Sequence, residues 1–569
     1  MRQVLQNLSS GETEIVEVPR PASAPGKVVI ETRATLVSPG TERMLVEFGK
    51  AGLISKARQQ PERVAQVLDK MRTDGVLQTL DAVRSKLDQP LPLGYCNVGT
   101  VVETGAGVTA FKPGDRVASN GGHAEAVSVG HNLVALVPDS VSDEAASFTV
   151  LGAIALQGIR LANPTLGESV AVIGLGLIGL LAVQLLHAQG CRVLAIDLDP
   201  AKVALAEGFG ATGVCPTKGE DVLAQADAFS RGNGIDAVLI TASTSSNEPV
   251  QQAAQMSRKR GRIVLVGVTG LELSRADFYQ KELSFQVSCS YGPGRYDPEY
   301  EEKGVDYPIG FVRWTEQRNF EAILDMMAAG KIDVTPLVTH RFPFAEAGKA
   351  YDVLVSKTPH LGIILQYEHR ADTLDTVIPL APPTNAAATA LGDPRISFIG
   401  AGNYAGRVLI PAFAKVGAKF GMISSSGGTS ASQIGNKFGF SSATTDLDRV
   451  FSDPTSAAVA IATRHDSHAG LVVRAMKAGK AVFVEKPLAL DLDELSDVEA
   501  TYRDLSAAGP APIVAVGFNR RFSPHVETMR SLLGGMKQPK SIVITVNAGA
   551  IPAQHWTQDR ALGGGRIIG

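Results

Sequence analysis

Hydrophobic and polar positions alternate in short runs over the first part of the chain, with turn residues between the runs. This pattern is typical of β-strands that bury one face. The expected strands cover 27–33, 97–103, 115–118, 124–129 and 133–137. Within 50–90 the hydrophobic spacing becomes helical, which predicts a helical hairpin inserted into a β-rich domain. We interpret the hairpin as an insertion packed on the strands; the alternative is a lid or an oligomer contact.

Strands alternate with helices from Leu166 onward, which predicts a parallel, doubly wound sheet. The expected strands are VAVIG, RVLAID, AVLIT and RIVLVG, separated by helical segments such as AKVALAEGF and EPVQQAAQM. A stretch of prolines and small residues without periodicity follows and predicts a linker. A second α/β pattern then starts at Ile396.

The fold class is therefore α/β, with a β-rich domain and two doubly wound domains. The predicted parts are a β-rich domain at 1–155 and 335–368 with its insert at 50–90, a doubly wound domain at 156–334, a linker at 369–395, a second doubly wound domain at 396–515, and the start of an α+β domain at 516–569. Residues 169–191 carry no charge and could span a bilayer, but they divide into strand, glycine turn and helix. We therefore expect no membrane segment.

Composition and charge exclude several classes of protein. The 569 residues are 44% hydrophobic and 20% charged, as in a globular chain of three to four domains at roughly 150 residues each. A formal net charge of -3 argues against nucleic acid as a partner. The cysteines form no C-x-x-C pair, which argues against a disulfide framework and favours a reducing cytoplasm. The N-terminus shows no signal peptide.

A glycine-rich turn, GLGLIG at 174–179, follows the strand VAVI and opens a helix. Glycines there permit a close backbone approach to a pyrophosphate, and the helix N-terminus offers free N–H groups. The next strand ends in Asp197, near the roughly 20-residue spacing of an acid that accepts from ribose hydroxyls. We predict NAD rather than NADP here; the alternative is a glycine turn followed by an unrelated acid. The candidate cofactor residues are Gly174, Leu175, Gly176, Leu177, Ile178, Gly179 and Asp197.

Four segments together carry a family resemblance. The segments KPGDRVA (112–118), GGHAEAVSV (121–129), the glycine turn and AEAGKAYDVL (345–354) resemble the medium-chain dehydrogenase/reductase family. The resemblance covers residues 1 to about 367. It implies a GroES-like catalytic domain around a Rossmann domain, with hydride transfer to a nicotinamide held between them.

The chain departs from the zinc-dependent members of that family. Their zinc ligands would stand in VSPGTER (37–43), GYC (94–96) and TVLGA (149–153), where proline or serine, Tyr95 and Leu151 stand instead. A catalytic zinc needs three protein ligands, so we predict no metal. Hydrogen-bond donors would then polarise the substrate oxygen, with Tyr95, Thr41 and Ser38 as candidates. The alternative is that these three are ordinary packing residues.

A second unusual segment, residues 290–319, gathers tyrosines, a tryptophan and arginines. Arginine forks bind carboxylates and aromatic faces cover sugar rings, so the segment suits a polyhydroxylated, carboxylate-bearing ligand. A surface loop stabilised by its own packing is the alternative. The candidate substrate residues are Tyr291, Arg295, Arg313 and Trp314.

The second α/β pattern opens with its own glycine turn, IGAGNYAG. Gly400 and Gly402 hold the dinucleotide positions, with Ala405 at the third. The following strand ends in serines, so Ser424 to Ser426 stand where the acid would be and either NAD or NADP is expected. The candidate cofactor residues are Gly400, Gly402, Asn403, Tyr404, Ser424 and Glu485.

Residues 396 to the end resemble the Gfo/Idh/MocA family of sugar and cyclitol oxidoreductases. The resemblance rests on Glu485-Lys486-Pro487, the segment around His468, and Asn519-Arg520-Arg521. It implies that Lys486 lies at the nicotinamide and assists proton transfer or orients the substrate; the alternative for Lys486 is an exposed turn. We add Arg520 as a substrate contact. The family's Asp and His should follow GGGRIIG, where the chain stops, and SIVITVNAGA is expected as a strand. This last domain is thus expected to be incomplete or degenerate.

Both halves together resemble the bi-domain oxidoreductases. We predict an NAD-linked oxidoreductase acting on a sugar, sugar acid or related polyol without catalytic zinc, with a small-molecule substrate and a homo-oligomer as its state. Two nicotinamide sites could oxidise and re-reduce one substrate, giving net epimerisation. The alternatives are a non-catalytic dinucleotide-binding scaffold and a zinc-independent NADPH reductase of enones or quinones.

Overall fold

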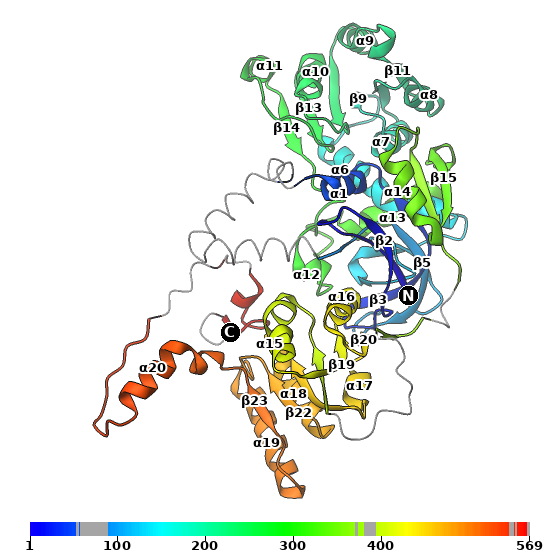
Figure 1. Cartoon of the computed structure of the whole chain (residues 1–569). Coiled ribbons are helices and arrows are strands. Elements are labelled where there is room, and N and C mark those ends of the chain that lie inside the picture. The colour runs from blue at the N-terminus through cyan, green and yellow to red at the C-terminus, as the bar shows by residue number, and fades with distance from the viewer. Residues whose placement is uncertain are drawn as a thin grey trace. The chain divides into compact units, whose positions relative to one another are not determined.

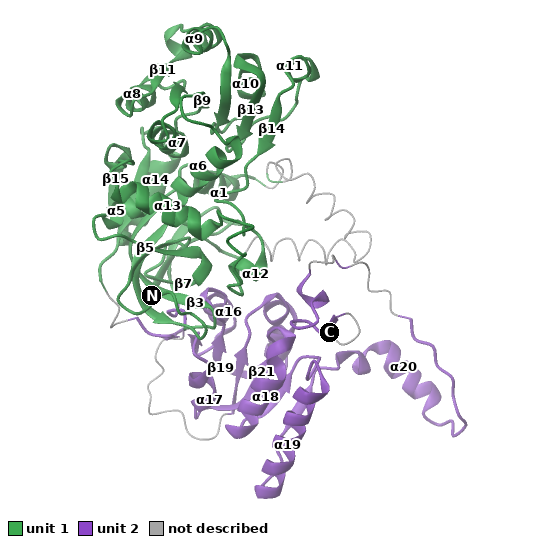
Figure 2. Cartoon of the chain, turned by 180° about the vertical axis from the view of Figure 1, so that it is seen from behind, with its two compact units in different colours: residues 1–17, 23–373 green, residues 18–22, 374–569 purple. Residues whose placement is uncertain are grey.

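The computed structural model describes residues 1–52, 56, 89–369, 374–380, 394–545, 551 and 555–565. The chain forms two compact units, one of residues 1–17 and 23–373 and one of 18–22 and 374–569 (Figure 1, Figure 2). Helix α1 (Thr41–Lys50) ends where the helical hairpin was expected. Almost all of that hairpin lies outside the described residues, so it stays a prediction.

The β-rich part of the first unit is a seven-stranded sheet. Its strands, in sheet order, are β15 (Val338–Pro343), β16 (Gly362–Gln366), β3 (Lys27–Val37), β5 (Asn97–Thr104), β6 (Arg116–Ser119) and β8 (Val134–Leu136), and β7 (Ala126–Gly130) also pairs with β3. A smaller sheet joins β2 (Thr13–Glu17), β1 (Arg2–Gln6) and β4 (Leu91–Pro92). Strand β16 pairs antiparallel with β3, so a late segment of the chain completes the sheet begun near the N-terminus.

A parallel sheet forms the rest of the first unit, with strand order β11-β10-β9-β12-β13-β14. The strands are β9 (Ser169–Ile173), β10 (Arg192–Ile196), β11 (Thr212–Val214), β12 (Ile235–Ile240), β13 (Ser257–Leu265) and β14 (Ser284–Val287). The helices are α6 (Thr149–Ala162), α7 (Leu177–Ala188), α8 (Pro200–Gly208), α9 (Val222–Phe229), α10 (Glu248–Met256), α11 (Arg275–Tyr279) and α13 (Glu316–Ala328). The order reverses between β9 and β12, which is where doubly wound sheets bind their ligands.

The uncharged stretch at 169–191 forms β9 and α7, both mostly buried. The apolar side chains of α9 and α10 cover one face of this sheet. Among the described residues, no helix is long and apolar enough to cross a bilayer.

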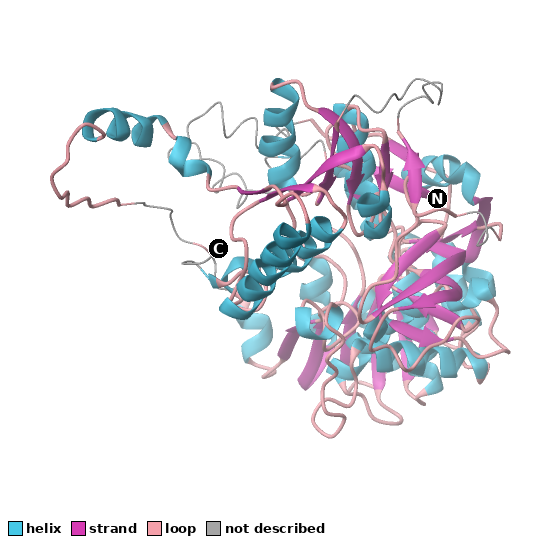
Figure 3. Cartoon of the chain, turned by 90° about the horizontal axis from the view of Figure 1, so that it is seen from below, coloured by secondary structure: helices cyan, strands magenta, loops and turns pink. Residues whose placement is uncertain are grey.

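The second unit holds another doubly wound sheet, with order β17-β20-β19-β18-β21-β22-β23. Figure 3 shows the strands and helices of the chain seen from below. The strands are β17 (Val377–Pro379), β18 (Arg395–Ile399), β19 (Lys419–Ser424), β20 (Ser442–Thr444), β21 (Ser456–Ile461), β22 (Ala481–Val484) and β23 (Val514–Val516). The helices are α15 (Ile410–Lys415), α16 (Thr429–Phe438), α17 (Leu447–Ser452), α18 (His468–Lys477), α19 (Leu492–Ala508) and α20 (Pro524–Leu533). Apolar side chains of α17, α18 and α19 form one hydrophobic core with the sheet, and those of α15 and α16 form a second core with it.

Two local expectations differ from the structure. Residues 377–379 fall inside the expected linker but form β17, because Val377 and Ile378 can pair antiparallel with β20 at the sheet edge. The strand expected at SIVITVNAGA is wrong for residues 541–545, which have no regular structure and leave Val543 89% exposed. The β-branched sequence there has no strand beside it in the described part of the chain, and a lone strand is not stable. The rest of that segment, 546–550, lies outside the described residues.

Candidate active site

Each of the three glycines of the first turn is required, or left open, for a different structural reason. Gly174 has φ +97°, and a Cβ there would meet the Ala242 backbone nitrogen at 2.6 Å. A Cβ on Gly179 would lie 2.0 Å from the Gly174 carbonyl oxygen. A Cβ on Gly176 would meet no atom within 4 Å, so this backbone is open to an approaching ligand. The turn thus provides a cradle of the kind that a pyrophosphate needs.

Helix α7 starts at this turn, with Gly176 as its N-cap and no side chain satisfying the cap. The N–H groups of Leu177, Ile178 and Gly179 therefore belong to a first helical turn that can bind an anion. The helix carries no acidic residue there that would repel one.

Asp197 lies beside the glycine turn. Its Oδ2 accepts a hydrogen bond from the Leu175 N–H at 2.6 Å, and its Oδ1 accepts from the Asp199 N–H at 2.8 Å. The backbone sets this position, because the Gly174 N–H donates to the carbonyl of Ile196, the residue before the acid, at 2.9 Å. The carboxylate is half-buried, so its outer side can still reach a ribose.

The three stretches that would hold a zinc ion come together in the β-rich part of the unit. The Tyr95 hydroxyl donates to Ser38 Oγ at 2.8 Å and lies 3.3 Å from Thr41 Oγ1. The buried Cys96 thiol interacts with the Leu151 backbone. Burial raises the pKa of Tyr95, and the neighbouring Cys96 raises it further, so this hydroxyl stays protonated.

The aromatic segment after β14 is packed largely on itself. Trp314 lies between the guanidinium groups of Arg160 and Arg313, whose carbons are 3.3 and 3.8 Å from the ring centroid. Arg295 pairs with Glu301 at 2.6 Å and lies over the Tyr291 ring. The Tyr291 hydroxyl, in turn, accepts from Asn120 Nδ2 at 3.3 Å. The substrate roles of these residues stay predictions.

A buried acid in this segment has no counterpart in the sequence-based expectations. Glu316 is fully buried, and within the described residues neither of its carboxylate oxygens has a hydrogen-bond donor. Burial and the nearby Glu301 raise the pKa of Glu316 to about 9, so it is protonated at neutral pH and can donate to Glu301. Its position at the start of α13 gave no sign of a partner fifteen residues earlier.

The glycine turn of the second unit has the same backbone arrangement. Gly400 has φ +102°, and a Cβ there would meet the Ala462 carbonyl oxygen at 2.4 Å, whereas Gly402 is open. Asn403 and Tyr404 are exposed, and the Tyr404 hydroxyl interacts with Glu485 and Asn519. The Gly400 N–H donates to the Ser424 carbonyl at 3.0 Å, so the register places Ser425 where Asp197 stands in the first sheet. Ser424 itself is buried at the end of β19.

Lys486 lies close to two buried histidines. His468 is held by the Pro487 and Thr463 carbonyls, at 2.7 and 3.3 Å from its ring nitrogens. His465 lies 2.9 Å from the Gly563 carbonyl, and burial lowers its pKa, an effect to which His468 and Lys486 add. Arg520 is exposed in the short turn Asn519–Phe522 after β23.

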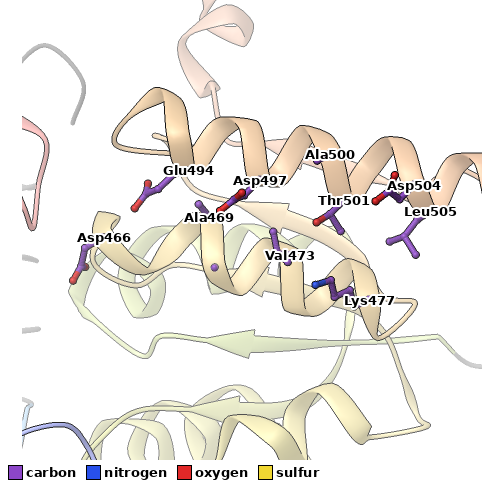
Figure 4. A pocket seen from close by; sticks show the side chains of 11 residues that line it. Asp466, Ala469, Val473, Lys477, Glu494, Asp497, Ala500, Thr501, Asp504 and Leu505 are labelled. Atoms are coloured by element: carbon purple, nitrogen blue, oxygen red, sulfur yellow. The ribbon is translucent and has the colours of Figure 1, made fainter. Parts of the chain in front are cut away.

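A groove of about 640 Å³ runs between α18 and α19 (Figure 4). Its lining includes Ala469 and Val473 from α18, and Leu505, Glu494 and Asp497 from α19. None of the predicted site residues lines it.

Comparisons with known proteins agree with this architecture. Residues 67–155 match the alcohol dehydrogenase GroES-like domain, 178–303 match the zinc-binding dehydrogenase model, and 394–508 match the oxidoreductase family with an NAD-binding Rossmann fold. An alcohol dehydrogenase of Geobacillus stearothermophilus is 30% identical over 269 residues, which cover 40% of this chain and 78% of that protein. This chain belongs to the alcohol dehydrogenase family. Its second unit carries the Rossmann domain of the Gfo/Idh/MocA oxidoreductases, so the chain is a fused, bi-domain oxidoreductase.

Other similar proteins are also dehydrogenases. (R,R)-Butanediol dehydrogenase of Bacillus subtilis is 31% identical over 232 residues, covering 36% of this chain and 66% of that protein. D-Guloside 3-dehydrogenase of Escherichia coli is 27% identical over 282 residues, covering 48% and 75%. The solved galactitol-1-phosphate dehydrogenase of Escherichia coli shares the fold, with a TM-score of 0.51, 20% identity and coverage of 64% and 100%. The protein is therefore a nicotinamide-dependent oxidoreductase acting on CH–OH groups.

The residues that meet at 37–43 and 94–96, where zinc-dependent members of the family would hold the metal, do not fit a catalytic zinc. The side chains that meet there are the hydroxyls of Ser38, Thr41 and Tyr95, whereas zinc prefers thiolate, imidazole and carboxylate ligands. The nearby Glu42 carboxylate is occupied by other donors. No group of three or more His, Cys, Asp or Glu side chains in the described ranges could hold a metal ion.

Glu42 and His123 are residues that sequence reasoning missed. His123 lies in the segment 121–129 that carried the family resemblance, and Glu42 lies in 37–43, where the chain departs from the zinc-dependent members; neither was given a role. Each is buried, and their side chains meet at 3.0 Å. No sequence pattern indicates this pair, because a Glu and a His 81 positions apart have no fixed spatial relation before the chain folds.

Proposed function

We propose that the first unit is an NAD-dependent dehydrogenase that interconverts a secondary alcohol and a ketone of a sugar, sugar acid or related polyol without zinc. The observation that carries the proposal is the cluster of hydroxyls formed by Ser38, Thr41 and Tyr95, in a fold that also holds the Asp197 turn. Both features are needed, because one addresses the cofactor and the other the reacting oxygen.

The cofactor part of the proposal rests on Asp197. When bound, NAD supplies the hydride acceptor. The turn from Gly174 to Gly179 would hold the pyrophosphate through backbone N–H groups. The Asp197 carboxylate, held by the Leu175 N–H, would accept from the ribose hydroxyls and repel the 2′-phosphate of NADP.

The catalytic part rests on hydroxyl donors. Tyr95 stays protonated, and its one proton points to Ser38 Oγ in this structure. On substrate binding that proton would turn to the substrate oxygen and stabilise the charge that develops there during carbonyl reduction. Thr41 and Ser38 hold the tyrosine hydroxyl from two sides. In the oxidation direction the same hydroxyl chain would relay the alcohol proton to water at the exposed Thr41, each hydroxyl accepting one proton as it passes on its own.

The substrate class draws on the aromatic segment and on a relative. Trp314 with Arg313, and Tyr291 with Arg295, combine ring faces and guanidinium groups. Such sets bind hydroxylated, anionic ligands, although here Trp314 lies between two arginines and Arg295 pairs with Glu301, so a ligand would have to displace these contacts. The similarity to D-guloside 3-dehydrogenase supports a sugar derivative.

The second unit would bind another nicotinamide cofactor, either NAD or NADP, at the turn of Gly400 and Gly402. Lys486 would lie at its reactive end and orient the substrate, and Arg520 would contact the substrate. With two such sites, one substrate could be oxidised and re-reduced, which gives net epimerisation.

Nicotinamide absorbance with the full chain tests the proposal. D-Glucuronate, methyl β-D-guloside, galactitol, myo-inositol and UDP-glucose are offered with NAD and with NADP, beside Asp197→Ala and Tyr95→Phe. We expect NAD reduction with at least one of them, loss of NAD affinity in Asp197→Ala, and loss of kcat in Tyr95→Phe. NAD binding with no turnover would indicate a scaffold instead. Dominant NADP use at the first site, or stoichiometric zinc by metal analysis, would overturn the assignment.

A further inference from the structure

The carboxylate of Glu42 is the centre of a buried hydrogen-bond network. Glu42 is 1% exposed, His123 0% and Tyr351 3%. His123 Nε2 lies 3.0 Å and the Tyr351 hydroxyl 2.5 Å from Glu42 Oε2, and the Ser38 N–H donates to Oε1 at 2.8 Å. The two oxygens therefore receive bonds from widely separated parts of the chain.

The hydrogen bonds can all point toward this carboxylate. If His123 donates from Nε2, its Nδ1 accepts from Thr35 Oγ1 at 2.7 Å, and Thr35 in turn accepts from the Tyr367 hydroxyl at 3.2 Å. Every donor in the chain then has one acceptor, with a neutral imidazole. In the described part of the chain, no lysine or arginine pairs with Glu42.

The network ends at the hydroxyl cluster of the proposed active site. Ser38 and Glu42 are tied twice, since the Glu42 N–H also donates to the Ser38 carbonyl at 3.1 Å. These bonds fix the turn that opens α1 and with it the Ser38 side chain. Ser38 Oγ then accepts from the Tyr95 hydroxyl at 2.8 Å.

A core of apolar residues would stabilise this region without desolvating a carboxylate, which is costly even when the group is well hydrogen-bonded. The free-energy cost of burying the Glu42 carboxylate is explained if its negative charge affects the protonation of neighbouring side chains. Glu42 raises the pKa of Cys96, after burial, and is a smaller contributor to the raised pKa of Tyr95. It thus favours the protonated, donating form of Tyr95.

We propose that Glu42, oriented by His123 and Tyr351, is a positioning residue that fixes Ser38 and thereby holds the Tyr95 hydroxyl in the place from which it can turn to the reacting oxygen. This inference rests on the proposed function of Tyr95. It assigns a role in turnover to residues that contact neither cofactor nor substrate.

The test compares Glu42→Gln with a matched control. Glu31→Gln also alters a buried glutamate paired with a histidine, since Glu31 Oε2 lies 2.8 Å from His369 Nδ1, and Glu31 belongs to no proposed site. Both variants are assayed with NAD and the five alcohols named above. We expect Glu42→Gln to lower kcat by about 10- to 100-fold, with KM and NAD affinity changed less than about 2-fold. Glu31→Gln should keep the wild-type kcat.

A second readout needs no cofactor. With ¹³Cζ-labelled tyrosine, the Tyr95 signal is assigned by its loss in Tyr95→Phe. We expect it to shift in Glu42→Gln and to stay in place in Glu31→Gln, because only the first change releases Ser38. Tyr351→Phe removes one hydroxyl while keeping the ring, so it covers the case in which Glu42→Gln does not fold; its kcat should fall by less than about 10-fold, with KM unchanged.

The outcomes separate the two proposals. If Tyr95→Phe keeps full kcat, the proposed function of Tyr95 fails, and the positioning role fails with it. If Tyr95→Phe loses activity while folded Glu42→Gln and Tyr351→Phe match Glu31→Gln, only the positioning role is refuted. A fall in kcat with equal losses of NAD affinity and melting temperature would mean that the network is structural, which also overturns the inference.

Discussion

The six parallel strands of the first unit are connected in the same order as six strands of the second, β20-β19-β18-β21-β22-β23, and the two sheets differ in the side chain beside the glycine turn. The bond from Gly174 N–H to Ile196 O has its equivalent in Gly400 N–H to Ser424 O. The following residue is Asp197 in one sheet and Ser425 in the other, and each donates its N–H to the next strand, at 3.3 and 3.2 Å. The backbone thus forms the same arrangement twice, and the first difference between the two turns is the carboxylate of Asp197.

The third glycine position shows a second difference. Gly179 leaves no room for a methyl group, whereas Ala405 stands at the equivalent place, buried and accommodated. Residues Ala405–Leu409 form a π-helical turn, which is wider than the α-helical start of α7. We infer that the wider turn makes room for the alanine methyl group.

The buried titratable groups of the two units should respond oppositely to pH, and the largest effect is expected at Glu316. Its folded pKa of about 9 lies above the ordinary value of 4.5. Its contribution to stability is therefore complete below pH 4.5 and is lost as pH rises toward 9, by at most about 1.4 kcal/mol per pH unit. Glu316→Gln, which can still donate to Glu301, should be more stable than the wild type at pH 8 by on the order of 3 kcal/mol. Urea unfolding at pH 5 and pH 8 measures this; equal pH slopes in both proteins would contradict it.

Exchanging the third position of the turn tests the packing difference. Gly179→Ala places a Cβ 2.0 Å from the Gly174 oxygen, so we expect destabilisation by about 2–3 kcal/mol and loss of NAD binding at the first site. The matched change Ala405→Gly should cost about 1 kcal/mol or less. Thermal unfolding and calorimetric NAD titration of both variants provide the comparison, and similar effects at the two positions would refute the explanation.

Exchanging the acid tests the cofactor difference. Asp197→Ser should weaken NAD binding by about 10- to 100-fold, because a charged hydrogen bond to ribose is lost. The ratio of NAD affinity to NADP affinity at the first site should also fall. Ser425→Asp should raise the preference of the second site for NAD. Competition between NAD and NADP in calorimetry, with Ser426→Asp as a neighbouring control, measures both. An unchanged preference in Asp197→Ser would remove the basis for assigning NAD.

The smallest effect is expected at His465 in the second unit. Its pKa lies below the ordinary 6.5, chiefly because it is buried. The contribution of the neutral ring is complete above pH 6.5 and is lost as pH falls below that value, the reverse of Glu316. His465→Asn should therefore flatten the acid side of the unfolding profile of the second unit, with little effect at pH 8. Urea unfolding at pH 5 and pH 8 checks this.

Sequence patterns predicted the two sheets and their glycine turns well, since these features are local. Asp197 could be located because a strand of known length leads from the turn to the same sheet edge. In the second unit the residue equivalent to Asp197 could not be chosen among Ser424 to Ser426 from the sequence. The backbone hydrogen bond from the Gly400 N–H to the Ser424 carbonyl identifies it as Ser425. The segment at 541–545 shows the limit of propensity, because β-branched residues do not form a strand without a partner.

The sequence by itself determined the alternation of strands and helices in the two doubly wound sheets and the place of the two glycine turns. Only the tertiary structure decided which distant side chains meet. Glu42 reaches Tyr351 across 309 positions, and Glu316 meets Glu301 through a folded loop. The reason is physical: periodicity encodes which face of an element is buried, whereas the pairing of buried polar groups depends on how those faces are brought together.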